Sequence, residues 1–204
     1  MEILDKETLS KKIYNRESIG FAFILSSLFN SVYEEIRYIA LNNPKIFFHE
    51  EYNIKDGKVV FKDSPKYKDC VLRLHKDRFI ASLKWFESIG AISNEDIEFI
   101  VNARSLRGDL IHNFVNTYIK KNDFNDEIEK FGKLLNLYNK IDNWWILNVE
   151  VATCLPDEVS DESDFENAHS LNCIFLNSMI DILLHGNDES YLKFEENLKR
   201  KNFK

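Results

Sequence analysis

The chain has 204 residues, a formal net charge of −7 and hydrophobic residues at 44% of its positions. This length suits one large domain whose core needs neither disulfides nor metals. The negative net charge argues against a protein that coats nucleic acid with its whole surface, because phosphate binding requires concentrated positive potential. The sequence therefore predicts a single domain over residues 1–204 in which any contact with nucleic acid is local.

Three sequence features bear on the cellular compartment, and none of them favours secretion or the membrane. The N-terminal residues carry charges from Glu2 onward and lack the pattern of a signal peptide. The longest apolar run, Ile19–Phe29, is too short to span a bilayer. The three cysteines, Cys70, Cys154 and Cys173, are irregularly spaced, which favours a reducing compartment. We expect a soluble cytoplasmic protein with no membrane partner.

The composition favours helices. Only 6 glycines and 3 prolines occur, which disfavours turn-rich β architectures. Residues 17–42 place apolar side chains at three- and four-residue spacing, the pattern of a helix with one buried face. This helix is expected to end before Pro44, because proline disfavours the helical conformation in the residue before it. The predicted fold is all-α, an up-and-down bundle of about five to seven helices.

One short segment between the helices has β character. Asp56-Gly57 lies between Tyr52–Ile54 and Lys58–Phe61, two runs that favour strands. Asp-Gly is a strong hairpin signal, because type I′ turns need positive φ at their two central residues. The sequence predicts a small β-hairpin over residues 51–62, inserted into the bundle.

The remaining helices follow from the same spacing rule. Residues 66–89 are predicted to form one helix that ends at a left-handed Gly90, and Ser93 supplies the N-cap of the next helix. Further helices are expected over residues 125–152, 170–185 and 188–199. A polar loop over residues 155–167 carries the acidic run Asp157–Glu166, which is expected to be solvated. The bundle core thus spans about residues 17–152, and the C-terminal helices span 168–199.

The segment Arg104–Asn113 carries the residues best suited to chemistry. On one straight helix, Arg107 and His112 would lie about 140° apart and about 7.5 Å apart along the axis. Gly108-Asp109 predicts instead that the helix breaks and restarts with Asp109 as its N-cap. His112 would then lie in the first turn of a new helix, where free amides and the helix dipole favour a phosphate.

In this context Arg107-Gly-Asp-Leu-Ile-His112 resembles the signature of the HEPN superfamily, an arginine followed after four to six residues by a histidine. That signature lies near the start of a late helix in an all-α bundle, and the stretch from Gly90 through Asn113 looks similar as well. The resemblance implies a homodimer whose paired sites face each other, and metal-independent RNA cleavage by the 2′-hydroxyl. No metal and no cofactor is expected. The chain has Gly108 where active members often carry Asn, Asp or His.

Each residue of the segment has an expected role. His112 would transfer protons near neutral pH, and Arg107 would stabilise the charge that develops on the phosphoryl oxygens. Arg104 is a candidate contact to substrate phosphate, and Asp109 and Asn113 would orient the imidazole or the arginine. The expected function is a HEPN-type endoribonuclease of a toxin–antitoxin or antiviral defence system. Its expected partners are RNA, a second copy of the chain and a restraining antitoxin protein.

Two other interpretations of this segment stay open. In the first, the chain is a non-catalytic HEPN-like module that binds RNA, a nucleotide or a regulatory protein. In the second, it is a helical interaction protein in which Arg107 pairs with a neighbouring acid and His112 is a hydrogen-bonded residue at a helix start.

Two weaker signals complete the sequence analysis. His169 and Cys173 lie at i, i+4 and would share a metal with Cys154, but a structural zinc site needs four ligands and the sequence offers no fourth, so none is expected. Seven basic residues between Lys62 and Lys84 indicate either a local basic face or a solvated surface.

Overall fold

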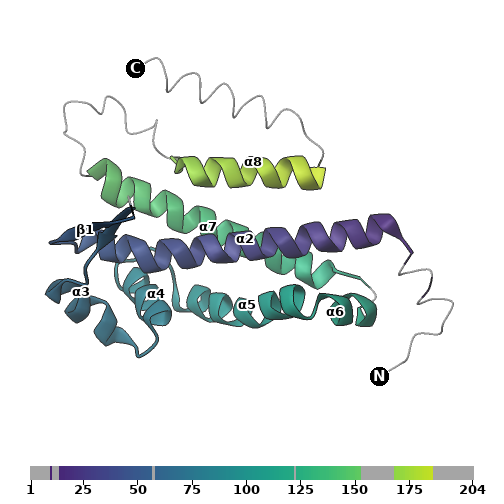
Figure 1. The fold of residues 1–204 in the computed structure, drawn as a ribbon, viewed down its shortest axis with the longest axis horizontal. Coiled ribbons are helices and arrows are strands. Elements are labelled where there is room, and N and C mark those ends of the chain that lie inside the picture. Colours follow the sequence, from purple (N-terminus) through teal and green to yellow (C-terminus); the bar gives the residue numbers. More distant parts are fainter. Residues whose placement is uncertain (1–9, 11–13, 57, 122, 153–167, 186–204) are drawn as a thin grey trace, which may run out of the picture. The chain divides into compact units, whose positions relative to one another are not determined.

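The computed structural model describes residues 10, 14–56, 58–121, 123–152 and 168–185. Over these ranges the chain forms seven α-helices and one two-stranded sheet (Figure 1), which confirms the all-α class with a small hairpin. Within them, no helix combines the length and the apolar character that a bilayer crossing requires. Cys154, the predicted acidic loop 155–167 and the predicted helix 188–199 lie outside the described residues.

The chain divides into two compact units. The first unit comprises residues 1–32 and 108–204, and the second comprises residues 33–107. The division falls inside two helices, α2 (Arg16–Phe47) and α5 (Asn94–His112), so each of these helices contributes to both units. The expectation of a single domain over residues 1–204 stays a prediction.

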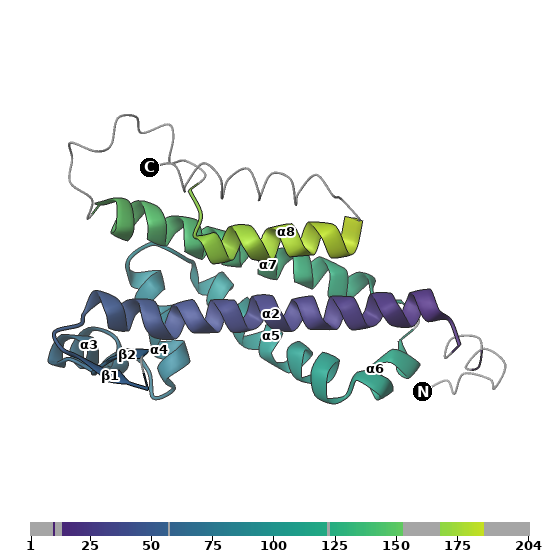
Figure 2. The same cartoon turned by 45° about the horizontal axis from the view of Figure 1, so that its top comes forward.

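The first unit is built on long helices. Besides its parts of α2 and α5 it contains α6 (Phe114–Lys120), α7 (Asn125–Trp145), the π-helix η2 (Ile146–Val151) and α8 (Leu171–His185). Helices α7 and α8 lie side by side and antiparallel (Figures 1 and 2). The buried face of α7 includes Phe131, Leu134 and Ile141, each of which is at most 4% exposed. The predicted helices 125–152 and 170–185 are confirmed.

The second unit combines short helices with the hairpin (Figure 2). Strands β1 (Tyr52–Lys55) and β2 (Lys58–Phe61) pair antiparallel, with Tyr52 opposite Phe61, and Asp56 between them has φ 51. A positive φ is what the turn residues of such a hairpin require. The hairpin predicted over residues 51–62 is confirmed.

The first long helix continues beyond its predicted end. Helix α2 runs through Pro44 to Phe47, so the expected stop before Pro44 was wrong. Proline removes the hydrogen bond of its own N–H, and its ring crowds the carbonyl four residues earlier, at a cost of about 3 kcal/mol in a helix interior. Pro44 lies in the last turn of α2, where only this one ladder hydrogen bond is lost. The carbonyl of Pro44 still accepts a hydrogen bond from the Phe48 amide at 3.1 Å. The cost is therefore small enough for the surrounding packing to offset.

The predicted helix 66–89 is divided into three pieces. These are α3 (Pro65–Cys70), the 3-10 turn η1 (Leu72–Leu74) and α4 (Arg78–Ser88). The Asp77 carboxylate accepts hydrogen bonds from the Phe79 and Ile80 amides, at 2.8 and 3.2 Å, and so starts a new helix. Apolar spacing alone missed this cap. Gly90 has φ 79 after α4, which confirms the predicted left-handed residue.

Candidate functional site

A polar pocket of about 620 Å³ lies within the second unit. Its longest wall is one face of α2, from Tyr33 to Lys45, and α5 adds Arg104 and Arg107. The start of α4 and Tyr67 of α3 complete it. Five cationic side chains and two carboxylic acids line this arginine pocket: Arg37, Lys45, Arg78, Arg104 and Arg107, with Glu34 and Asp77. The pocket therefore has a local excess of positive charge in an acidic protein.

Carboxylates hold most of the cations of the arginine pocket in place. Glu34 pairs with Arg107 at 2.7 Å and with Arg37 at 3.3 Å. Asp63, next to the pocket, pairs with Arg78 at 2.8 Å and with Lys45 at 3.1 Å. Burial raises the pKa of Asp63, but the hydrogen bonds and charges of Lys45 and Arg78 outweigh burial and leave that pKa below its usual range. Each carboxylate thus orients two cations, which prepares them for an anionic ligand.

Aromatic rings support the guanidinium groups. The Arg107 guanidinium carbon lies 5.8 Å from the centre of the Tyr33 ring, and that of Arg78 lies 6.0 Å from the Tyr67 ring. Both tyrosines are at most 2% exposed. Burial raises the pKa of Tyr33, although Arg104 and other nearby arginines oppose the rise, so its hydroxyl stays protonated at neutral pH. Cation–π contacts of this kind hold a guanidinium in one orientation while leaving its edge open to a ligand.

Arg104 differs from the other cations of the arginine pocket. Its side chain is exposed, and it forms no hydrogen bond or ion pair with any other residue in the described part of the chain. Glu34 and Asp63 already neutralise neighbouring cations. Arg104 is therefore the pocket cation whose hydrogen-bonding capacity remains for a bound anion.

The helix break expected at Gly108-Asp109 was wrong. Helix α5 is continuous from Asn94 to His112, and the interruption lies at Asn113, before α6. Glycine inside a helix costs only about 1 kcal/mol, and Leu110, two residues later, is 1% exposed. Burial of such a side chain outweighs that cost. His112 thus ends a helix instead of opening one, and the predicted phosphate site at a helix N-terminus is not formed there.

The other residues of the predicted segment lie around this helix end. His112 is exposed and its ring forms no hydrogen bond within the described ranges. The side-chain amide of Asn113 donates to the Asp109 carboxylate at 3.4 Å. The Thr117 hydroxyl donates to the backbone carbonyl of Asp109 at 3.2 Å. Asp109 and Asn113 therefore contact each other, and Arg107 contacts Glu34. Arg107 belongs to the second unit and His112 to the first.

Sequence reasoning found Arg104 and Arg107 but missed the cations across the pocket. Arg37, Leu41 and Lys45 are spaced by four, so they occupy one face of α2 that looks like an ordinary solvated surface. Of the seven basic residues between Lys62 and Lys84, only Arg78 lines the pocket. Only the packing of α2 beside α4 and α5 in this unit distinguishes these cations from other surface charges.

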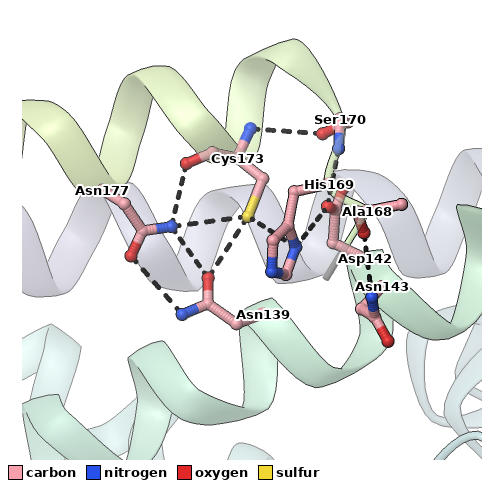
Figure 3. Close-up of polar contacts among 8 residues, drawn as sticks. All are labelled: Asn139, Asp142, Asn143, Ala168, His169, Ser170, Cys173 and Asn177. Carbon is pink, nitrogen blue, oxygen red and sulfur yellow. Dashed lines mark hydrogen bonds and ion pairs between the residues drawn. The ribbon is translucent and has the colours of Figure 1, made fainter. Parts of the chain in front are cut away.

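A second group of polar side chains lies in the first unit, where α7 meets the start of α8 (Figure 3). His169 Nδ1 is 3.2 Å from Asp142 Oδ2 and 3.5 Å from Cys173 Sγ. Burial raises the pKa of the Cys173 thiol, and the Asp142 carboxylate raises it further. The carboxylate and the thiol both face the same ring nitrogen, whereas a nucleophile–histidine–acid triad uses both nitrogens. This arrangement does not activate Cys173 as a nucleophile.

Comparison of the chain with protein-family models, with curated proteins and with solved structures gave no match.

Proposed function

We propose that this protein binds RNA through the arginine pocket, as a HEPN-type ribonuclease does with its substrate. The observation that carries this proposal is the pocket itself, in which Arg104 and Arg107 of the HEPN-like segment lie with three further cations. Arginine forks match the paired oxygens of a phosphate, and stacked aromatic rings keep them pre-oriented. A local cationic pocket also accounts for RNA binding by a chain of net charge −7.

The binding step is tested with a labelled single-stranded RNA of mixed sequence, by fluorescence anisotropy at low salt. Arg104→Ala is expected to weaken binding about tenfold, because a hydrogen bond between charged groups contributes roughly 1.5 kcal/mol or more. Arg73→Ala is the matched control, since Arg73 is an exposed arginine of the same unit that does not line the pocket. Equal affinities of wild type and Arg104→Ala would contradict the proposal. If mononucleotides displace the labelled RNA completely, the ligand of the pocket is a nucleotide and not an RNA chain.

For catalysis we assign the roles that the HEPN resemblance implies. His112 accepts the proton of the 2′-hydroxyl, whose oxygen attacks the adjacent phosphorus and forms a 2′,3′-cyclic phosphate. The bond from phosphorus to the 5′-oxygen breaks, and this oxygen takes a proton from solvent as it leaves. Arg107 stabilises the negative charge that develops on the phosphoryl oxygens. The scheme needs no metal ion, and in a homodimer the second copy supplies the facing residues.

The cleavage step is tested on total RNA in the presence of EDTA. Wild type is expected to produce fragments ending in 2′,3′-cyclic phosphate, and His112→Ala is expected to produce none while keeping the circular dichroism of wild type. Growth arrest on expression in the cytoplasm, abolished by Arg107→Ala, would support a toxin that an antitoxin partner restrains. RNA that stays intact with both proteins would remove catalysis from the proposal.

A non-catalytic RNA- or nucleotide-binding module is the second candidate function. Two observations favour it: Arg107 is held by Glu34 at 2.7 Å, and Gly108 replaces the polar residue that active HEPN members often carry. In that case Arg104→Ala still weakens RNA binding, whereas no cleavage product appears with the wild-type protein. The two assays together therefore distinguish the module from the enzyme.

A further inference from the structure

Four polar side chains converge between α7 and α8 of the first unit (Figure 3). Asn139 and Asp142 lie one turn apart on α7, and so face α8 together. His169 lies two residues before α8 begins at Leu171, and Cys173 lies in the first turn of this helix. We call these four residues the Asp–His–Cys cluster. They bring the carboxylate, imidazole, thiol and amide groups that bind transition metals to one point.

The spacing of the donor atoms fits a tetrahedral ion. Asp142 Oδ2 and His169 Nδ1 are 3.2 Å apart, and His169 Nδ1 and Cys173 Sγ are 3.5 Å apart. Zinc–nitrogen and zinc–oxygen bonds of about 2.0 Å, with a zinc–sulfur bond of about 2.3 Å, give tetrahedral edges of about 3.3 and 3.5 Å. Asn139 Oδ1 accepts a hydrogen bond from Cys173 Sγ at 3.2 Å, and we assign this oxygen as the fourth donor to the ion. The three ionisable groups lie within 4.8 Å of one another.

Burial and charge also favour a dication here. Asp142 is 4% exposed and Cys173 is fully buried. No lysine or arginine in the described part of the chain forms an ion pair with Asp142, and a buried carboxylate without a cation is costly. A dication bound by one carboxylate, one thiolate, a neutral imidazole and a neutral amide gives a cluster without net charge. The thiol proton leaves to solvent when the metal–sulfur bond forms.

Hydrogen bonds from neighbouring groups hold the metal-binding atoms of the cluster in place, as they do around the ligands of known metal sites. The Ser170 amide donates to Asp142 Oδ2 at 2.9 Å, and Asn177 Nδ2 donates to Asn139 Oδ1 at 2.9 Å. Asn177 Nδ2 also lies 3.4 Å from Cys173 Sγ. Hydrogen-bond donors beside a thiolate or a metal-binding carboxylate stabilise the charged form of that group.

We propose that Asp142, His169, Cys173 and Asn139 bind one zinc ion that joins α8 to α7. The site is independent of the arginine pocket and of the chemistry assigned to His112. Sequence inspection considered His169 and Cys173 but rejected a metal for lack of a fourth ligand. Asp142 and Asn139 lie about thirty residues earlier in the chain, where no short motif connects them to the histidine and the cysteine.

The test uses the full chain, prepared metal-free and titrated with cobalt(II) as a spectroscopic substitute for zinc. We expect one cobalt per chain, with the sulfur-to-cobalt charge-transfer band and the intense visible bands of a tetrahedral site, and displacement of cobalt by zinc. Cys173→Ala is expected to lose the charge-transfer band and to bind zinc at least about 100-fold more weakly. Cys70→Ser changes an exposed cysteine of the second unit, so it is the matched control and is expected to keep both properties.

Two further variants keep the proposal falsifiable if Cys173→Ala fails to fold. His169→Gln changes a side chain that is 27% exposed, and it is expected to lose zinc while keeping the helical circular dichroism of wild type. Asn177→Ala removes the hydrogen bonds that hold Asn139 Oδ1 and Cys173 Sγ in place, so it should weaken zinc binding about tenfold. The proposal is overturned if metal-free wild type binds neither cobalt nor zinc at one ion per chain. It is also overturned if the charge-transfer band survives in Cys173→Ala, or if His169→Gln binds zinc as wild type does.

Discussion

The arginine pocket of the second unit and the Asp–His–Cys cluster of the first unit arrange charge in opposite ways. In and beside the pocket, the Glu34 and Asp63 carboxylates are partly exposed, and each pairs with two cations. In the cluster, the Asp142 carboxylate is 4% exposed and contacts the Ser170 amide, the His169 ring and the Cys173 thiol. Paired cations at a surface suit a large anionic ligand. A buried carboxylate beside a thiol and an imidazole suits a small cation.

The largest expected difference between the two regions is in stability. We predict that Asp142→Ala, measured by urea denaturation in EDTA, lowers the free energy of unfolding by about 1–3 kcal/mol, because it leaves the partly buried Ser170 amide without its acceptor. Glu34→Ala is the matched change in the arginine pocket. Its carboxylate is 38% exposed, so the loss should stay below about 1 kcal/mol. Equal losses would show that the two carboxylates are not held differently.

The next largest expected difference is in how strongly salt weakens ligand binding at the two regions. If the arginine pocket contacts three phosphates of a single-stranded RNA, raising salt from 50 to 200 mM should weaken binding about 20-fold. Arg104→Ala should remove one phosphate contact and so reduce the slope of log affinity against log salt by about 1. Zinc binding by the Asp–His–Cys cluster should change little over the same range, since buried charges are weakly screened. A salt-independent RNA affinity would contradict binding through the pocket cations.

Acid should remove the contribution of Asp63, the carboxylate beside the arginine pocket, to the stability of the fold. The pKa of Asp63 is lowered in the folded protein, so its ionised form stabilises the fold at neutral pH. This contribution, about 1 kcal/mol or less for a partly exposed group, is lost as the pH falls from about 4 through the lower folded pKa. We therefore expect Asp63→Asn to be less stable than wild type at pH 7 and the difference to shrink below pH 4. Denaturation curves of both proteins across this range measure it, and a difference that does not depend on pH would contradict the assignment.

The smallest expected effect concerns the helix that carries Arg107. Gly108 lies inside α5 with open space where a Cβ would be. Gly108→Ala should therefore raise the free energy of unfolding by about 0.5–1 kcal/mol, since alanine is the better helix former. Gly132→Ala, at an equally open position inside α7, is the matched control and should give a similar gain. Destabilisation by Gly108→Ala alone would show that α5 needs a glycine there.

Much of the fold could be predicted because helices and turns depend on local chemistry. The apolar spacing of residues 17–42 and Asp56-Gly57 predicted a long helix and the hairpin, and Gly90 has the positive φ expected of it. Helix interruptions were predicted less well. Pro44 and Gly108 both lie inside helices, because packing outweighs costs of about 1–3 kcal/mol that appear decisive in the sequence alone.

The sequence by itself determined the helical class, the hairpin and the presence of Arg104, Arg107 and His112 in one segment. Only the tertiary structure decided which cations share a pocket with Arg107, since Arg37 and Lys45 lie about sixty to seventy residues away along the chain. It likewise decided that Asp142 faces His169 and Cys173. Periodicity shows which side of a helix is polar. Which polar sides meet depends on how helices pack, and that depends on contacts between residues distant in sequence.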